Sequence, residues 1–296
     1  YLYSQKYGKG DIDLIIASDN SALDFLLQFR NELFPEVPVV FCGINNYTTE
    51  MTSGQTGMGG ILENINIAGT LDMALKLLPA TRHLTVISDN TGTGKFHLQM
   101  FQSEAPAFAK RLEIKELIEW NWSELKENLK NLPENSIVLA LSLHRDSAGV
   151  SFSESEVSDF LKSNCQRPVF TLWDVKVGPG TLGGLVMNAE RHGEAAAQMA
   201  LRIIEGKIGK DQIPVESDSP DMYVFDYSEL KRFQISESQL PLHSNVINQP
   251  FSIYRQYRGL FISIIAMFIL MVLLVAALST ILMLKRRMEQ EKAEIE

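Results

Sequence analysis

Cysteine is scarce in this chain, and its placement excludes two kinds of architecture. The 296 residues include two cysteines, Cys42 and Cys165, and neither belongs to a CxxC pair or stands near a histidine cluster. This spacing excludes a cysteine-based metal framework and argues against a disulfide scaffold. Each cysteine lies in or beside a predicted buried strand, so we expect two core thiols. A bond between them would require a fold that brings them within reach.

Basic clusters and an N-terminal export signal are also lacking. The net charge is -9, and the only basic run is Lys285-Arg286-Arg287, so we expect no nucleic-acid partner. Residues 1–10, YLYSQKYGKG, contain no basic segment followed by an apolar one, and therefore no signal peptide. We expect the sequence to be a fragment that lacks its original N-terminus.

One long apolar run dominates the C-terminal part. Residues 260–284 carry no charge, and a helix of this length would measure ~37 Å, enough to cross a hydrocarbon layer of ~30 Å. A core helix of a soluble protein rarely lacks a polar face over such a length, so the run predicts a transmembrane helix in a lipid bilayer. Basic residues are more frequent after the run (Lys285, Arg286, Arg287 and Lys292) than before it (Arg255 and Arg258), which predicts a cytoplasmic C-terminus.

The tail beyond this run has a short repeat. Leu284, Met288, Glu291 and Ile295 follow spacings of four, three and four, and three of them are apolar. The pattern predicts the start of a coiled coil and hence a homodimer through the membrane and cytoplasmic helices. A short solvated helix is the alternative.

The remainder of the chain alternates strands and helices, which predicts an α/β fold with parallel sheets covered on both faces. The predicted strands span residues 12–17, 37–42, 83–88, 112–120, 136–141 and 168–173. The predicted helices span residues 21–34, 70–78, 95–111, 122–131, 153–163 and 191–206.

Small polar residues follow five of these strands. In open α/β sheets, ligands bind beyond the carboxyl ends of the strands, where helix N-termini offer free backbone donors. Helix capping is the alternative role of such residues. Five converging loops favour a ligand cleft, and the donors favour an anionic group such as a carboxylate. The candidate ligand-binding residues are Ser18, Asp19, Asn20, Asn45, Asn46, Asp89, Asn90, Thr91, Gly92, His144, Trp173 and Asp174. Trp173 serves equally well as a core residue.

Catalytic motifs are incomplete. Residues 178–183 match GxGxxG, but an extended segment follows instead of a helix. Residues 91–95, TGTGK, lack the glycine spacing of a phosphate loop, and residues 144–146, HRD, lack a nucleophile placed by the fold. We therefore expect no enzymatic activity, no cofactor and no metal within this chain.

Several blocks in order resemble a known family. They are IDLIIASDNSALDFL, VPVVFCGIN, GILENINIAGTLDMALKLLP, HLTVISDNTGTG, PVFTLWD and GGLVMNAERHGEAAAQMALRIIEGK. They resemble the substrate-binding proteins of ABC transporters, which have the type I periplasmic-binding fold. The closing stretch that leads into the apolar run is similar to the version found as the sensor of bacterial histidine kinases.

The resemblance implies two α/β lobes with a ligand between them. It implies a partial lobe one at 1–66, without its first βα units, lobe two at 67–174, and a return to lobe one at 175–233. A juxtamembrane linker at 234–259, the membrane helix at 260–284 and a cytoplasmic coiled-coil start at 285–296 would follow.

The function implied is ligand sensing at a bacterial inner membrane, with the large N-terminal part periplasmic or extracellular. A small molecule would bind in the cleft, and closure of the lobes would move the membrane helix. Two alternatives remain open: a membrane-anchored component of an ABC transporter, and a module that senses a partner binding protein.

Overall fold

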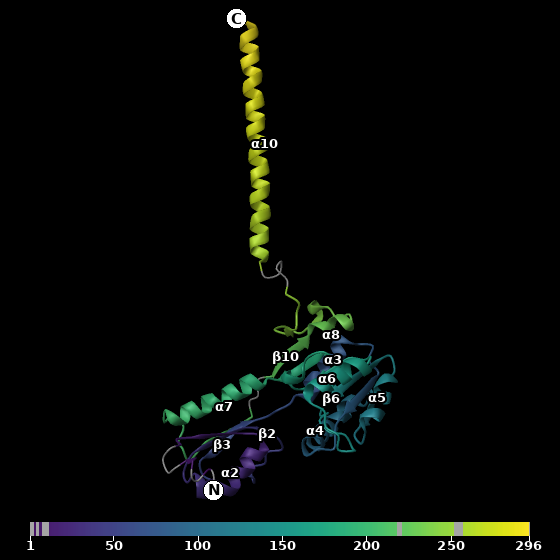
Figure 1. Ribbon diagram of the computed structural model, residues 1–296, viewed down its shortest axis with the longest axis vertical. Coiled ribbons are helices and arrows are strands. Elements are labelled where there is room, and N and C mark those ends of the chain that lie inside the picture. Colours follow the sequence, from purple (N-terminus) through teal and green to yellow (C-terminus); the bar gives the residue numbers. More distant parts are fainter. Residues whose placement is uncertain (1–2, 4–5, 8–11, 218–220, 252–256, 296) are drawn as a thin grey trace. The chain divides into compact units, whose positions relative to one another are not determined.

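The computed structural model describes residues 3, 6–7, 12–217, 221–251 and 257–295, with side chains as far as residue 290. It has two compact units, Tyr1–Gln249 and Pro250–Glu296. The first unit contains two sheets with their helices (Figure 1), and each sheet with its covering helices is called a lobe below.

The first lobe is built on a four-stranded parallel sheet of order β1-β2-β3-β9. Its two faces are both apolar, as expected for buried parallel strands. Phe41 packs on one face with Leu23 of α2, whereas Val40 packs on the other with Met199 of α7. The elements are β1 (Ile15–Ser18), α2 (Asn20–Leu33), β2 (Val39–Ile44), β3 (Met58–Leu62), α7 (Ala189–Ile204) and β9 (Val215–Glu216).

The second lobe is built on a seven-stranded sheet of order β11-β10-β8-β7-β6-β4-β5. Leu139 of β6 faces the helices α3 and α4, and its neighbour Val138 faces α5 and α6. The elements are α3 (Ile67–Leu77), β4 (His83–Ile87), α4 (Gly92–Phe108), β5 (Glu113–Leu117), α5 (Trp122–Lys130), β6 (Ser136–Ala140), α6 (Glu154–Asn164), β7 (Val169–Thr171), η1 (Asp174–Lys176), β8 (Gly183–Met187), β10 (Asp221–Asp226), α8 (Tyr227–Arg232), η2 (Glu237–Gln239) and β11 (Asn245–Ile247).

The range 175–233 differs from the expectation that it completes lobe one. Only α7 and β9 of this range belong to the first lobe, whereas β8 pairs with β7 and β10 in the second sheet. A close backbone approach makes this pairing possible: a Cβ on Gly183 would lie 1.9 Å from the Val224 carbonyl oxygen. The chain passes between the lobes after β3, after β8 and after β9.

The range 234–259 also differs from the expected linker. Ile235 is buried, and β11 adds a parallel strand to β10 at the edge of the second sheet. This part of the range therefore belongs to the second lobe. Residues 252–256 lie outside the described part.

The six predicted strands and six predicted helices all occur, with ends shifted by a few residues. Both cysteines are free and buried, which confirms the prediction of core thiols. The strand β3 was missed because its sequence, MGGIL, has two glycines and a weak strand pattern. Gly60 is required there, since a Cβ would lie 2.0 Å from the Phe41 carbonyl oxygen.

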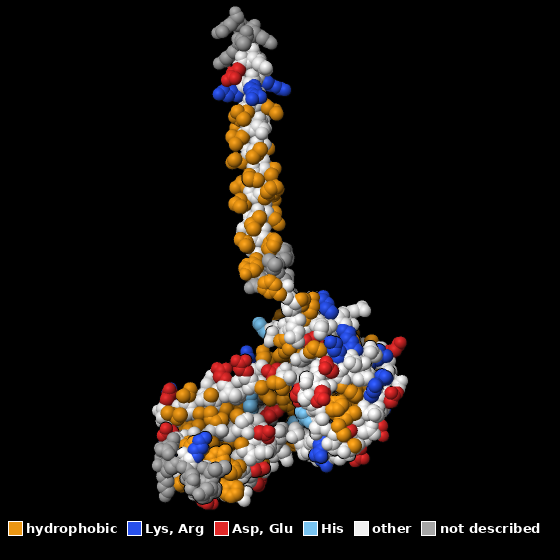
Figure 2. All heavy atoms as spheres, viewed as in Figure 1, with side chains coloured by type: hydrophobic (Ala, Val, Ile, Leu, Met, Phe, Trp, Pro, Cys, Tyr) orange, Lys and Arg blue, Asp and Glu red, His pale blue; other side chains and the backbone are white. Residues whose placement is uncertain are grey.

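The second unit contains the helix α10 (Arg258–Ile295). Within the part of the chain that the structure describes, this is the one helix long and apolar enough to cross a membrane, with a mean hydropathy of 3.1 over an 18-residue stretch. Figure 2 shows apolar side chains along it and Lys and Arg side chains beyond them. Of the predicted coiled-coil positions, the side chains of Glu291 and Ile295 lie outside the described part, as does most of the segment 1–10.

Candidate functional site

A cleft of about 390 Å³ lies where the carboxyl ends of strands from both lobes meet. Three lining residues follow β1, β2 and β3 of the first lobe, and the others follow β4, β6 and β7 of the second. This is the edge at which ligands bind in open α/β sheets. The lining residues are Asp19, Asn45 and Glu63 from the first lobe, with Thr91, Thr93, His97, Leu141, Ser142, His144, Glu154, Trp173, Val175 and Lys176 from the second.

Trp173 joins the two sides of the cleft. Its ring is 7% exposed, and its centroid lies 4.7 Å from that of His97 and 4.7 Å from the Lys176 Nζ atom. Its indole N–H donates a hydrogen bond of 2.6 Å to Glu63 Oε1 across the cleft. Trp173 thus presents a rigid apolar surface whose polar atom is held by the opposite lobe.

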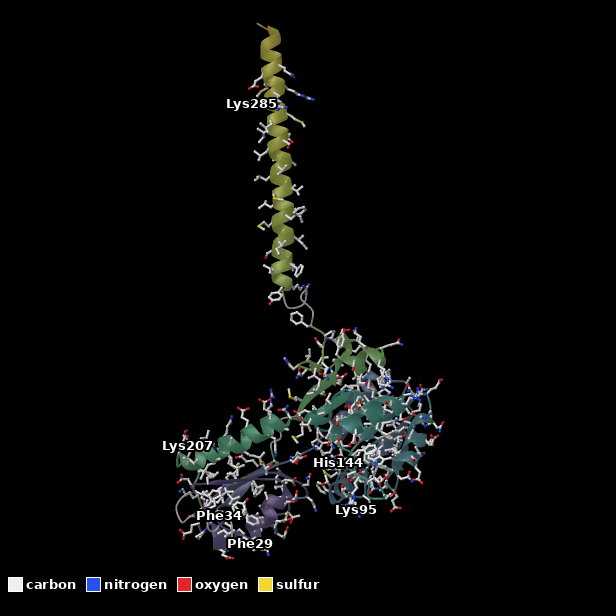
Figure 3. The ribbon with its side chains drawn as sticks, viewed as in Figure 1. Phe29, Phe34, Lys95, His144, Lys207 and Lys285 are labelled. Atoms are coloured by element: carbon white, nitrogen blue, oxygen red, sulfur yellow. The ribbon has the colours of Figure 1, made fainter. Side chains whose placement is uncertain are left out.

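Lys176 is the cation of the cleft. Its Nζ atom lies 3.4 Å from His144 Nε2, and His144 Nδ1 lies 3.4 Å from Glu154 Oε1. Burial lowers the pKa of Lys176, while the negative charges of Glu154, Asp89 and Glu63 oppose that shift. A partly desolvated ammonium group favours an anionic ligand, because its remaining hydration is weak. His144 is labelled in Figure 3, on the second lobe.

His97 contributes a neutral imidazole. It is 2% exposed, and burial together with the positive charge of Lys176 lowers its pKa to about 4. Its Nδ1 atom has no hydrogen-bond partner in the described part of the chain. At neutral pH this ring therefore offers uncharged hydrogen-bonding groups beside the Trp173 ring.

Asp89 organises the loops of the second lobe. Its Oδ2 atom accepts hydrogen bonds from the Ser142 hydroxyl and the His144 backbone N–H, both at 2.8 Å. Its Oδ1 atom accepts from the backbone N–H and the hydroxyl of Thr91. Burial alone would raise the pKa of Asp89, but these hydrogen bonds outweigh it and lower the pKa. The carboxylate stays charged and ties the β4–α4 loop to the β6–α6 loop.

Five of the twelve predicted ligand-binding residues line the cleft. They are Asp19, Asn45, Thr91, His144 and Trp173. Asp19 is exposed and has φ of 76°, an uncommon conformation for a residue other than glycine. The structure brings these five together from five different loops, which agrees with the reasoning from strand ends.

The other seven do not line this cleft, and three of them instead brace neighbouring segments of the chain. Asn20 braces the loop after β2, since its side chain bonds both the N–H and the carbonyl of Asn45. Asp174 accepts hydrogen bonds from the Asn188 side chain and the Ala189 N–H, at the start of α7. Asp89 has the bracing role given above. The remaining four are Ser18, Asn46, Asn90 and Gly92.

Sequence reasoning missed six polar residues of the cleft. Two of them, Ser142 and Glu154, follow β6, as the predicted His144 does. Glu63 follows β3, a strand that the sequence did not reveal. Lys176 stands only five residues after β7, so its distance from a predicted strand end was a usable signal. Thr93 and His97 lie on α4, and His97 reaches the cleft from the second turn of that helix. A histidine inside a helix gives no sequence signal for such a position.

Metal ligands do not cluster in the region described. No group of three or more His, Cys, Asp or Glu side chains there could hold a metal ion. The arrangement can hold a small organic molecule by charge, hydrogen bonds and the Trp173 surface.

Comparison with known proteins shows the fold. No family model matches the chain, and no curated protein sequence matches it. Similar solved structures include the ligand-free, open structure of a substrate binding protein with adhesive properties from Clostridium difficile, at 16% identity and a TM-score of 0.60. That alignment covers 84% of this chain and 81% of the other. The ABC domain in complex with L-Trp from Streptococcus pneumonia is 17% identical, with a TM-score of 0.59 over 83% of this chain and 82% of the other.

A third similar structure is a conserved domain protein from Vibrio cholerae, at 13% identity and a TM-score of 0.54, covering 79% of this chain and 78% of the other. The first unit therefore has the type I periplasmic-binding fold, as the sequence predicted.

Proposed function

We propose that this chain is the ligand-sensing region of a membrane receptor, and that it binds a small solute with an anionic group such as a carboxylate. The observation that carries the proposal is the cleft, where strand ends from both lobes surround Lys176 and Trp173. Lys176 supplies the positive charge, and the N-terminus of α4 lies beside it with Thr91 and Thr93. The Streptococcus structure was solved with L-Trp, which carries a carboxylate and supports this ligand class.

Signalling would use the connection to α10. A ligand that contacts both lobes binds their closed arrangement better and shifts the population toward it. Movement of the second lobe would then pull on the segment that leads into the membrane helix, and a dimer of such helices would carry the signal to a cytoplasmic output. We propose a histidine kinase as that output, and binding without chemical conversion in the cleft.

A second candidate is a membrane-anchored binding component of an ABC transporter. The name of the Clostridium protein, a substrate binding protein, favours it. The α10 helix, placed after the lobes and carrying Lys285, Arg286 and Arg287 directly after its apolar stretch, favours the receptor. A module that senses another binding protein is a third candidate, and it would need no small ligand.

A thermal-unfolding screen of the full chain in lipid nanodiscs tests the proposal. The probes are amino acids, small carboxylates, nucleosides and sugars, and a ligand specific for the native state raises Tm. We expect carboxylates to raise Tm in the wild type and not in Lys176→Met. A hit confined to uncharged sugars would contradict the anionic ligand class. A flat screen would contradict direct sensing and favour a protein partner.

A further inference from the structure

A second cavity of about 240 Å³ adjoins the cleft. It lies between α6, the ends of β6 and β7, and the segment 175–181. Four residues line both spaces: His144, Glu154, Val175 and Lys176. The cation of the cleft therefore stands at the boundary of the two cavities.

The walls of this side cavity are mainly apolar. Leu143, Val157, Leu161 and Val177 contribute buried side chains, and Ala140 leaves space above β6. Among the described residues, no lysine or arginine other than Lys176 lines it. Its chemistry suits a hydrocarbon group attached to a charged head at Lys176.

Thr171 adds one polar feature to this cavity. It is fully buried, it lines the cavity, and its hydroxyl oxygen has no hydrogen-bond partner among the residues that the structure describes. Strand alternation explains its direction: Phe170 packs toward α3 and α4, whereas Val169 packs toward α5 and α6, and Thr171 shares the face of Val169. Buried hydroxyls are normally paired, so an unpaired one in a cavity wall indicates a missing partner.

We propose that the side cavity is a subsite for one arm of the ligand. This inference rests on the proposed function and extends it to a substrate class. The ligand is an acid whose carboxylate lies at Lys176 and whose apolar arm enters the side cavity. The arm ends in an atom that hydrogen-bonds the Thr171 hydroxyl.

Calorimetry on the full chain in nanodiscs tests the subsite with acetate, hexanoate and 6-hydroxyhexanoate. These probes share the carboxylate and differ in the arm and in its terminal hydroxyl. We expect hexanoate to bind at least about tenfold tighter than acetate, because its methylenes leave water. We expect 6-hydroxyhexanoate to bind about threefold to tenfold tighter than hexanoate, because its hydroxyl pairs with Thr171.

Two variants assign these differences to the cavity. Thr171→Val keeps the shape of the side chain and should abolish the advantage of 6-hydroxyhexanoate over hexanoate, with acetate unchanged. Ala140→Leu fills the cavity and should reduce hexanoate binding to the level of acetate. Thr85→Val, a buried threonine of β4 that lines neither the cleft nor the side cavity, is the matched control and should preserve all three affinities.

The outcomes separate the two proposals. Equal binding of acetate and hexanoate, weakened in Lys176→Met, would overturn the subsite and leave the carboxylate cleft intact. Unchanged 6-hydroxyhexanoate binding in Thr171→Val would overturn the pairing with Thr171. No binding of any acid would overturn both proposals. If Ala140→Leu does not fold, Thr171→Val still decides the question.

Discussion

The two walls of the cleft differ in charge and in how they are held. The first lobe contributes the carboxylates of Asp19 and Glu63, and Asp19 is exposed. The second lobe contributes Lys176, two imidazoles and the Trp173 ring, with Glu154 at its margin. A buried carboxylate holds the loops of the second wall, whereas the side-chain amide of Asn20 holds the first.

This difference separates residues that build a wall from residues that face the ligand. A polar side chain after a strand either fixes neighbouring loops or faces the ligand, and its hydrogen bonds within the protein show which of these roles it has. Both carboxylate oxygens of Asp89 accept hydrogen bonds from its own lobe, whereas Lys176 and His97 line the cleft and His97 Nδ1 is unpaired among the described residues. The second wall is therefore the rigid part of the site, and the first wall is the acidic partner that meets it through Glu63.

Removal of Asp89 should loosen the loops of the second wall and give the largest loss of stability predicted for this protein. Asp89→Ala leaves the buried Ser142 hydroxyl and two partly buried backbone donors without their acceptor. We expect the free energy of unfolding to fall by about 4 kcal/mol, measured by urea unfolding in nanodiscs. Asp19→Asn on the exposed first wall is the control and should cost under about 0.5 kcal/mol, because asparagine keeps an N-cap oxygen for α2 and tolerates a positive φ. An equal loss in both variants would refute the contrast between the walls.

Acidification should weaken the same wall through His97. The folded pKa is about 4, whereas an unfolded histidine titrates near ~6.5, so between these values the unfolded chain binds a proton that the folded protein does not. Stability therefore falls as the pH decreases, by about 2 kcal/mol between pH ~7 and pH ~5. Urea unfolding at both pH values measures this change.

His97→Gln should remove that part of the pH dependence, and His243→Gln, at an exposed position, should retain it. His192 is also buried with a lowered pKa and contributes in the same direction, so some dependence should persist in His97→Gln. A wild-type stability that is constant over this range would contradict the neutral, buried His97.

The sequence predicted where several cleft residues of both walls lie, but not which polar residues face the ligand. Strand ends are visible as apolar runs that stop at polar residues, and this signal placed Asp19, Asn45 and His144 at one cleft. The same signal does not distinguish a residue that holds a loop in place from one that contacts the ligand, because Asn20 and Asp89 are of the same residue types as the cleft residues Asn45 and Asp19. Only the hydrogen bonds of the folded chain separate them.

Residues that enter the cleft from unexpected elements were beyond sequence reasoning. Glu63 depends on β3, whose glycines allow close packing against β2 and against residues 213–214, and hide the strand pattern. The membership of β8 and β10 in the second sheet depends on pairing between segments far apart in sequence. Local patterns do not encode such pairings, so they could not predict that β8 and β10 join the second sheet.

Loss of the Lys176 charge should weaken carboxylate binding without destabilising the protein, unlike the loss of Asp89. Lys176→Met keeps an unbranched apolar stem and removes the only lysine or arginine among the described residues that line the cleft. We expect the affinity for a carboxylate probe to fall about tenfold in calorimetry, with no loss of stability, because the ammonium group is partly desolvated. Lys95→Met, an exposed residue of α4 labelled in Figure 3, should bind as the wild type does. Tighter binding in Lys176→Met would assign the anion to another group.

The contact between the walls should give the smallest effect. Glu63→Ala removes the acceptor of the Trp173 indole N–H, whereas Glu63→Gln keeps an oxygen at that position. If this hydrogen bond stabilises the arrangement that binds ligand, affinity for the carboxylate probe should fall about threefold in Glu63→Ala and stay near the wild-type value in Glu63→Gln. Removal of the Glu63 charge alone would instead strengthen anion binding, and by the same amount in both variants. Calorimetry on the pair therefore distinguishes a structural bond across the cleft from simple repulsion between Glu63 and the ligand.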